Sequence, residues 1–221
     1  MPVDVRLNAI VDPENAGGHD LVALARSCAE GGTTLVQLRD KRSETRAMVA
    51  SARAIKQALA PFGIPLVVND RVDVALAAGA NGVHVGQDDM AVEDARRLLG
   101  PGAIIGLSIK TVAEAEAAPV DLIDYIGSGG VYATISKQQK NAPIGPAGLA
   151  RIVDVFRRRV PKGLPLCGIA GIDAGNAAAV IAAGADGVAV ISALSRAADP
   201  AAAARALRRT VDAALAQRDA R

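Results

Sequence analysis

Aromatic residues are almost absent from this sequence, which has no tryptophan, two tyrosines and two phenylalanines among its 221 residues. The chain therefore lacks the aromatic platforms on which single-stranded nucleic acids stack. An excess of one charge is also missing, because 25 basic and 23 acidic residues leave a formal net charge of only +2. A chain with this balance has no strong field that attracts nucleic acid. Nucleic acid is thus excluded as the expected partner.

Cysteine and long apolar runs are scarce as well. Cys28 and Cys167 are too few and too far apart for a disulfide framework or a cysteine-based metal site. We expect both to be buried as small hydrophobic side chains. Met1 is not followed by the basic and apolar pattern of a leader, and no hydrophobic run reaches the length of a membrane span. The sequence therefore predicts a soluble, cytoplasmic protein without membrane contact.

What the sequence does contain is a regular alternation of short aliphatic strands and helices. Strands that are apolar on both faces and separated by helices are typical of a buried parallel sheet. Eight strand–helix units, spaced by about 27 residues, favour a single compact (β/α)8 barrel (TIM barrel) over residues 1–221. A doubly wound open sheet is the alternative, but the chain has no G-x-G-x-x-G motif after its first strand. The expected strands are 5–11, 33–38, 65–69, 81–85, 103–108, 123–127, 164–169 and 185–191. The expected helices are 19–30, 70–78, 91–99, 111–117, 146–160, 173–183 and 200–217. One more helix starts after Ser43, its expected N-cap, and runs to about 61–63. A long loop covers 129–145.

The second predicted strand ends in the polar segment 36–41 (VQLRDK). Side chains alternate along a strand, so Gln37 and Arg39 leave one face and Leu38 the other. An amide with two cations, Arg39 and Lys41, suits a polyanion attached to a polar ring, whereas an ordinary charged surface cluster is the alternative. Because barrels carry their chemistry at the C-terminal ends of the strands, the fold prediction places this segment at the active rim.

Two further features follow other strands at the same rim. Asp70 and Asp89 are hard oxygen ligands without a Cys or His partner, a pair that suits Mg²⁺ completed by water and phosphate oxygens. Asp70 could instead cap the following helix, and Asp88 is a rival to Asp89. Gly171 and Ser192 follow the last two strands, where barrels commonly bind phosphate on backbone N–H groups. The expected ligands are one diphosphate with Mg²⁺ and one monophosphate.

With these segments in place, the chain resembles the thiamine-phosphate synthase family along nearly its whole length. The resemblance implies a transferase that joins 4-amino-2-methyl-5-(diphosphooxymethyl)pyrimidine to a thiazole phosphate carboxylate. The products would be thiamine phosphate, pyrophosphate and CO₂, and the diphosphate would leave first with the help of Mg²⁺. The segments that carry the resemblance are 36–41 (VQLRDK), 69–76 (NDRVDVAL), 82–89 (GVHVGQDD), 134–137 (TISK), 168–172 (GIAGI) and 184–192 (GADGVAVIS).

By matched position, the resemblance also implies which residues form the site. Asp70 and Asp89 would bind Mg²⁺. From its place between Arg39 and Lys41, we expect Asp40 to tether a cation or face solvent. No protein nucleophile is required when the substrate ionises by itself, and the sequence shows no Cys–His or Ser–His signature. The pyrimidine diphosphate would contact Gln37, Leu38, Arg39, Asp40, Lys41, Asn69, Ser108 and Lys137, of which Arg39, Lys41, Ser108 and Lys137 would be catalytic. The thiazole phosphate would contact Thr134, Ile135, Ser136, Gly171, Ile191 and Ser192.

This chain departs from the family pattern at three places. The family usually has Gly-Pro before the strand-6 loop, Pro-Thr-x-Thr-Lys within it and Gly-Gly after strand 7, where this chain has Gly129-Gly130, 133–137 (ATISK) and Ala170-Gly171. Two alternative functions stay open. One is a thiazole tautomerase, which needs an acid–base group such as His84; the sequence favours His84 as a hydrogen-bonded barrel residue. The other is a non-catalytic thiazole phosphate-binding barrel, and the sequence leaves a homo-oligomer open in each case.

Overall fold

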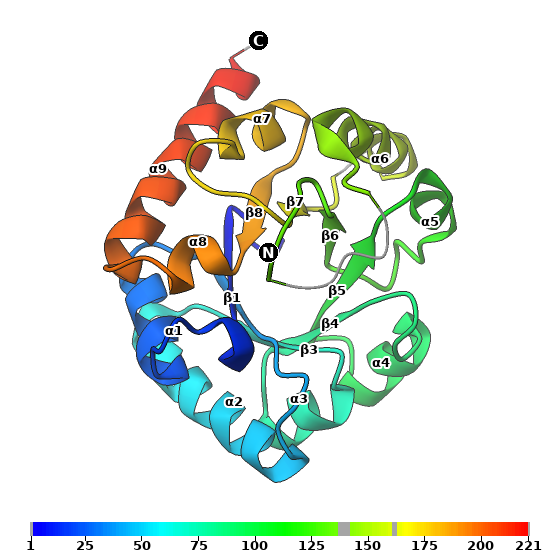
Figure 1. Cartoon of the computed structure of the whole chain (residues 1–221). Helices are drawn as coiled ribbons and strands as arrows, with labels where there is room; N and C mark the ends of the chain where they lie inside the picture. Colours follow the sequence, from blue (N-terminus) through cyan, green and yellow to red (C-terminus); the bar gives the residue numbers. More distant parts are fainter. Residues whose placement is uncertain (1, 137–141, 161–162, 221) are drawn as a thin grey trace.

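The structure, a computed structural model, describes residues 2–136, 142–160 and 163–220. Its parallel strands close into a barrel in chain order, with β8 paired to β1 (Figure 1). The closed barrel confirms the predicted (β/α)8 fold and excludes the open sheet. The strands are β1 Leu7–Val11, β2 Leu35–Leu38, β3 Leu66–Asn69, β4 Gly82–Val85, β5 Ile104–Ile109, β6 Tyr125–Gly129, β7 Leu166–Ile169 and β8 Gly187–Val190.

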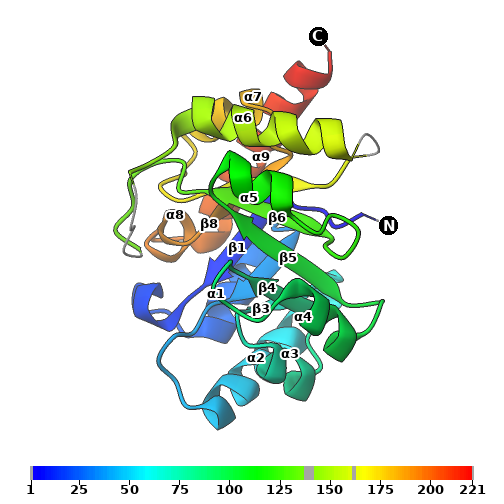
Figure 2. The ribbon, with the colours of Figure 1, turned by 90° about the vertical axis from the view of Figure 1, so that its right-hand side faces the viewer.

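Helices surround the barrel, and the side view shows them packed along its outer wall (Figure 2). In the described ranges, no helix is long and apolar enough to cross a membrane. The α-helices are α1 Leu21–Glu30, α2 Thr45–Leu59, α3 Val72–Ala78, α4 Val92–Leu99, α5 Val112–Ala117, α6 Gly145–Arg159, α7 Ala177–Ala182, α8 Ser192–Ser195 and α9 Pro200–Asp219, with 3-10 turns η1 Pro13–Asn15 and η2 Ala60–Phe62.

Several details of the helices differ from the prediction. The N-cap of α2 is Glu44 rather than Ser43, and it makes no side-chain capping hydrogen bond. Helix α7 begins four residues late because Asp173 and Asn176 form a turn, in which the Asn176 Oδ1 accepts from the Asp173 N–H at 2.9 Å. The short helix α8 was not expected, since a four-residue helix leaves no periodic pattern in the sequence.

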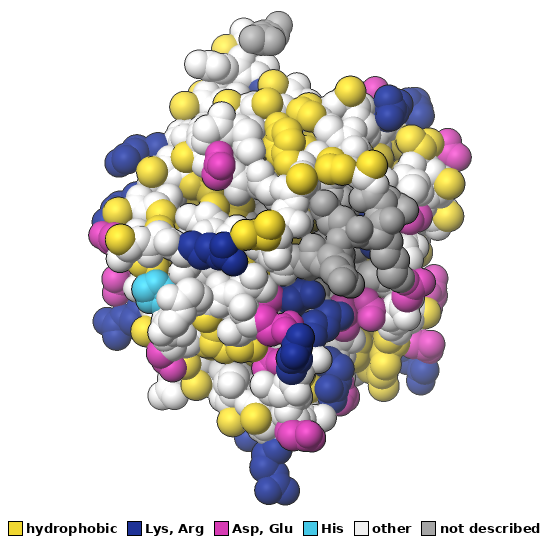
Figure 3. Space-filling model, viewed as in Figure 1, with side chains coloured by type: hydrophobic (Ala, Val, Ile, Leu, Met, Phe, Trp, Pro, Cys, Tyr) yellow, Lys and Arg dark blue, Asp and Glu magenta, His cyan; other side chains and the backbone are white. Residues whose placement is uncertain are grey.

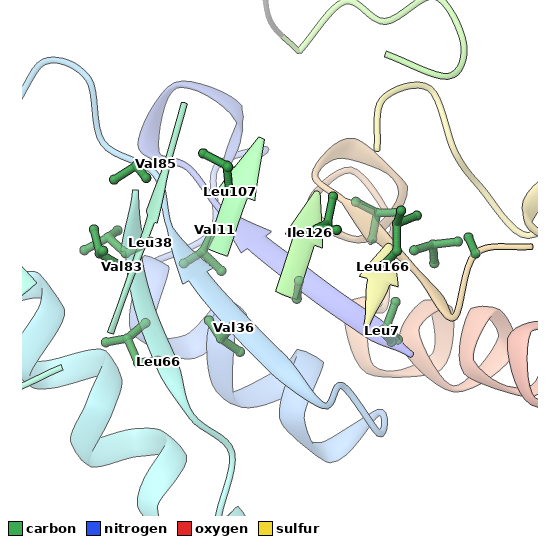
Figure 4. Packing of buried hydrophobic residues seen from close by; sticks show 14 of the residues in the cluster. Leu7, Val11, Val36, Leu38, Leu66, Val83, Val85, Leu107, Ile126 and Leu166 are labelled. Atoms are coloured by element: carbon green, nitrogen blue, oxygen red, sulfur yellow. The ribbon is translucent and has the colours of Figure 1, made fainter. Parts of the chain in front are cut away.

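Alternation along the strands divides the core into two layers. Leu35 packs inside the barrel with Val67 and Tyr125. Val36 and Leu38 face the opposite way and pack in the larger layer between the strands and the helices (Figure 4). This confirms the predicted alternation of β2, so Gln37 and Arg39 follow Leu35 on the barrel-facing side. Cys28 and Cys167 are buried and free, as expected.

The short turns before the strands fix how neighbouring strands are aligned. The Asn81 Oδ1 accepts a hydrogen bond of 3.0 Å from the backbone N–H of Leu66. Asp186 does the same for Leu166, at 3.1 Å. A Cβ at Gly187 would lie 1.8 Å from a neighbouring carbonyl oxygen, so only glycine fits there. Because these turns anchor the strand starts, the strand ends meet at one rim, where the site is built.

Candidate active site

A pocket opens at the C-terminal end of the barrel, with an empty volume of about 580 Å³ including its solvent-facing part. On the face seen in Figure 3, basic and acidic side chains lie next to one another near the centre. The structure thus gathers most of the predicted site residues in one place. Those that line the pocket are Gln37, Arg39, Asn69, Ser108, Thr134, Ser136, Gly171, Ile191 and Ser192.

Gln37 and Ser108 belong to one buried hydrogen-bond chain. The Gln37 side chain is hydrogen-bonded to Tyr125, whose hydroxyl lies 2.8 Å from Nδ1 of His84. The Nε2 of His84 lies 2.9 Å from the Ser108 Oγ. Burial raises the pKa of Tyr125 well above its ordinary value, and the hydrogen bond to Gln37 only partly opposes this. The phenol therefore stays protonated and acts as a fixed link below the pocket.

The hydrogen-bond chain contradicts one prediction from the sequence and confirms another. The sequence showed no Ser–His pair, but His84 and Ser108 form one because β4 and β5 are adjacent. Its geometry is not that of an activated serine, since the second nitrogen of His84 meets a phenol rather than an orienting carboxylate. The prediction that His84 is a hydrogen-bonded barrel residue is confirmed. A Cβ at Gly106 would lie 2.5 Å from the His84 ring, so this glycine leaves the ring its space.

Arg39 is held by a carboxylate that the sequence analysis missed. Its Nη1 donates to the Oδ2 of Asp12 at 2.5 Å, and Asp12 is only 1% exposed. Asp12 directly follows β1, so the rule that polar residues gather at strand ends could have identified it. The Arg39 side chain is itself largely buried, with 17% exposure, and it lines the pocket. A guanidinium fixed in this way presents its remaining N–H groups from a defined position.

Asp70 lies where three charged groups converge. It forms an ion pair with Lys41 and interacts with the carboxyl group of Asp89. Burial raises the pKa of Asp70 above its ordinary value; the ion pair with Lys41 opposes the shift, and Asp89 adds to it. The Asp70 backbone has φ 61°, a left-handed conformation that non-glycine residues rarely adopt and that clusters at functional sites. The alternative of a helix cap is excluded, because the N-cap of α3 is Arg71.

The donors at Asp70 fit a hard divalent cation. Two neighbouring carboxylates, completed by water and substrate phosphate oxygens, are a typical Mg²⁺ environment. The geometry favours Asp89 over Asp88, since Asp89 interacts with Asp70 and its Oδ2 accepts from the Gly86 N–H at 2.7 Å. Within the described residues, no group of three or more His, Cys, Asp or Glu side chains gathers as a metal site. The protein would thus supply few ligands itself.

The opposite side of the pocket is formed by side-chain hydroxyl groups and a closely packed backbone turn. Gly171 has φ 65°, and a Cβ there would lie 2.3 Å from the carbonyl oxygen of Ala133. The Ser136 Oγ is buried and has no hydrogen-bond partner among the described residues, whereas its N–H donates to the Thr134 Oγ1 at 3.2 Å. Ser192 lines the same wall. A buried unpaired hydroxyl beside a glycine turn fits an anionic ligand such as a phosphate.

Among the described residues, six predicted site residues do not line this pocket: Leu38, Asp40, Lys41, Asp70, Asp89 and Ile135. The side chain of Leu38 is buried towards the helices, so only its backbone could meet a ligand. Asp40 is buried rather than solvent-facing, its Oδ1 accepts from the backbone N–H groups of Arg42 and Ser43, and it forms no ion pair with another described residue. Ile135 is 78% exposed and lines a neighbouring hollow. Lys137 lies outside the described residues.

Comparisons with known proteins agree on one family. Residues 7–194 match the family model described as thiamine monophosphate synthase. The chain is 50% identical over 190 residues to a thiamine-phosphate synthase of Agrobacterium fabrum, covering 86% of each chain. It is 47% identical to one of Xanthobacter autotrophicus, covering 86% of this chain and 88% of the other. A solved thiamine phosphate pyrophosphorylase from Pyrococcus furiosus superposes with a TM-score of 0.84 at 35% identity, over 96% of this chain and 98% of that one.

Proposed function

Because the chain belongs to the thiamine monophosphate synthase family, we propose that it makes thiamine phosphate. The substrates are 4-amino-2-methyl-5-(diphosphooxymethyl)pyrimidine and the carboxylated thiazole phosphate, and pyrophosphate and CO₂ are released. One observation carries this proposal. Arg39 lines the same pocket as the unpaired hydroxyl of Ser136, so one cavity offers a diphosphate end and a phosphate end. Residues 1–221 act as one barrel domain, and the reaction takes place in the cytoplasm.

Departure of the diphosphate is the step that needs most help from the protein. Negative charge develops on the leaving group, and the cations Arg39 and Lys41 stabilise it electrostatically from fixed positions. Gln37 and Asn69 hold the pyrimidine ring, and Lys137 belongs to the same set by its matched position. Asp70 and Asp89 hold Mg²⁺, which when bound neutralises charge on the diphosphate oxygens. The thiazole nitrogen then attacks the methylene carbon that lost the diphosphate, and the bond from the thiazole to its carboxylate breaks to release CO₂, so no protein nucleophile is used.

The thiazole phosphate occupies the other end of the pocket. Ser136 and Thr134 donate from the strand-6 loop, while the backbone of Gly171 and Ser192 with Ile191 completes the cradle. Ile135 contributes through its backbone, because its side chain is exposed. A tautomerase that used His84 fits less well, since both ring nitrogens are already hydrogen-bonded and the residue is 6% exposed.

Turnover with both substrates tests the proposal directly. Purified protein is incubated with the pyrimidine diphosphate, the thiazole phosphate and Mg²⁺, and thiamine phosphate is detected by mass. Formation of product that requires all three supports the synthase. If thiazole phosphate binds but no thiamine phosphate forms, the proposal is wrong and a non-catalytic binder remains. Asp70→Ala separates the same alternatives, because it abolishes turnover in a synthase and leaves a pure thiazole phosphate binder unaffected.

A further inference from the structure

A polar bridge from the segment after β1 joins Arg39 to the backbone of Ser136. We propose that Asp12 and Asn15 are positioning residues that couple the diphosphate end, at Arg39, to the phosphate end, at Ser136. This inference rests on the proposed function, because it assigns the two ends to the two substrates. It assigns a role to the segment after β1, where the sequence had pointed to neither Asp12 nor Asn15.

The first half of the bridge is the carboxylate of Asp12. Its Oδ2 accepts from Arg39 Nη1 at 2.5 Å and from Asn15 Nδ2 at 3.1 Å, while its Oδ1 accepts from the N–H of Glu14 at 2.9 Å. A carboxylate that is 1% exposed is stable only if such partners compensate for lost water. Asp12 therefore needs Arg39 and Asn15 in these positions, and in turn fixes both.

The second half of the bridge is the amide of Asn15. Its Nδ2 also donates to the backbone carbonyl oxygen of Ser136 at 3.1 Å, a contact between residues 121 positions apart. Ser136 is the last described residue before the gap in its loop; it lines the pocket, and its buried hydroxyl has no partner among the described residues. One amide group thus connects the carboxylate that holds Arg39 with the loop that offers the phosphate its hydroxyl.

A shared bridge makes the two ends energetically dependent. A diphosphate bound by Arg39 fixes the positions of Asp12 and Asn15. These residues in turn fix the position of Ser136 for the thiazole phosphate. By linkage, each ligand then tightens the binding of the other by the same factor. Asp12 and Asn15 touch neither ligand in this account; they act through Arg39 and Ser136.

The test measures this coupling without turnover. Calorimetry gives the Kd of thiazole phosphate with and without saturating pyrophosphate and Mg²⁺, where pyrophosphate is the probe for the Arg39 end. We expect pyrophosphate to tighten binding in the wild type by about fivefold or more, the usual lower range of coupling. Asn15→Ala and Asp12→Asn each bring this factor close to one. Glu14→Gln is the matched control, since Glu14 pairs with Arg42 and not with Arg39, and it keeps the wild-type factor.

The outcomes separate the two proposals. If the wild type makes no thiamine phosphate, the proposed function fails. If it makes thiamine phosphate but Asn15→Ala keeps the full coupling, or the wild type shows none, the bridge is wrong. Asn15→Ala removes a half-buried amide, so its melting temperature shows whether the fold is intact. Should Asp12→Asn not fold, Asn15→Ala alone decides the question.

Discussion

The imidazole of His84 joins the hydroxyl groups of Tyr125 and Ser108 through its two ring nitrogens, at 2.8 Å and 2.9 Å. These residues come from β4, β6 and β5, so one ring ties together the floor of the pocket. Tyr125 is fully buried and also meets Gln37. The hydroxyl of Tyr125 thus carries two hydrogen bonds that position side chains expected to meet the pyrimidine.

Removal of that hydroxyl should be costly. Tyr125→Phe leaves His84 and Gln37 without this partner in a buried site, which costs about 1–3 kcal/mol of stability. We also expect a higher KM for the pyrimidine diphosphate, since Gln37 and Ser108 lose their fixed orientation. Urea unfolding and steady-state kinetics measure the two effects. A variant as stable as the wild type would show that the chain of hydrogen bonds contributes nothing.

Arg39 should not tolerate replacement by lysine. Arg39→Lys keeps the charge but removes the planar fork that can meet Asp12 and a diphosphate together. We expect kcat to fall by roughly 10²–10³-fold, the usual loss when one preorganised group is removed. Arg42→Lys is the control, because Arg42 is largely exposed and pairs with Glu14. Equal effects of the two substitutions would contradict a special role for Arg39.

Asp88 and Asp89, which follow β4, should differ in how their replacement changes the Mg²⁺ dependence of activity. Asp89→Asn should raise the Mg²⁺ concentration needed for half-maximal activity by about tenfold or more, equivalent to about 1.4 kcal/mol. Asp88→Asn should leave it unchanged, since Asp89, and not Asp88, interacts with Asp70. A Mg²⁺ titration of activity, with binding of Mn²⁺ followed independently, compares the variants. The opposite ranking would make Asp88 the ligand.

Asp40 should stabilise the protein in a pH-dependent way. Burial raises its pKa, but hydrogen bonds from Ser43 and Arg42 outweigh this and place the pKa below the ordinary 3.8. A lowered folded-state pKa contributes stability above the unfolded value, and this is lost as pH falls through the folded value. Asp40→Asn should therefore lose about 0.5–1 kcal/mol at pH 7. Urea unfolding should show that deficit shrinking as the pH falls below about 3.8; a constant deficit would contradict the electrostatic origin.

Ala170 is strained where the family usually has glycine. Its φ of 81° lies in the left-handed region, which costs an alanine about 1 kcal/mol or more. Ala170→Gly should thus raise the free energy of unfolding by up to about 1 kcal/mol. Ala179→Gly, at an exposed interior position of α7, should instead lower it by about 0.5–1 kcal/mol. If both substitutions destabilise equally, the backbone of Ala170 is not strained.

Much of this site could be inferred from local patterns. The alternation of β2 assigned Gln37 and Arg39 to one face, and the rule for barrel strand ends gathered Asn69, Ser108 and Gly171 at one rim. Asp40 was misplaced for an equally local reason. Its carboxylate turns back to the N–H groups of Arg42 and Ser43, and no sequence pattern distinguishes such a turn from a surface charge.

The sequence by itself determined the barrel and its polar rim, because strand period, helix period and turn residues act over a few positions. Only the tertiary structure decided which side chains meet. Arg39 reaches Asp12 across 27 positions, His84 reaches Tyr125 across 41, and Asn15 reaches Ser136 across 121. These contacts depend on how the closed barrel aligns strands that are remote in the sequence. Hydrogen bonds tolerate only a few tenths of an ångström, a precision that no pattern of residue types contains.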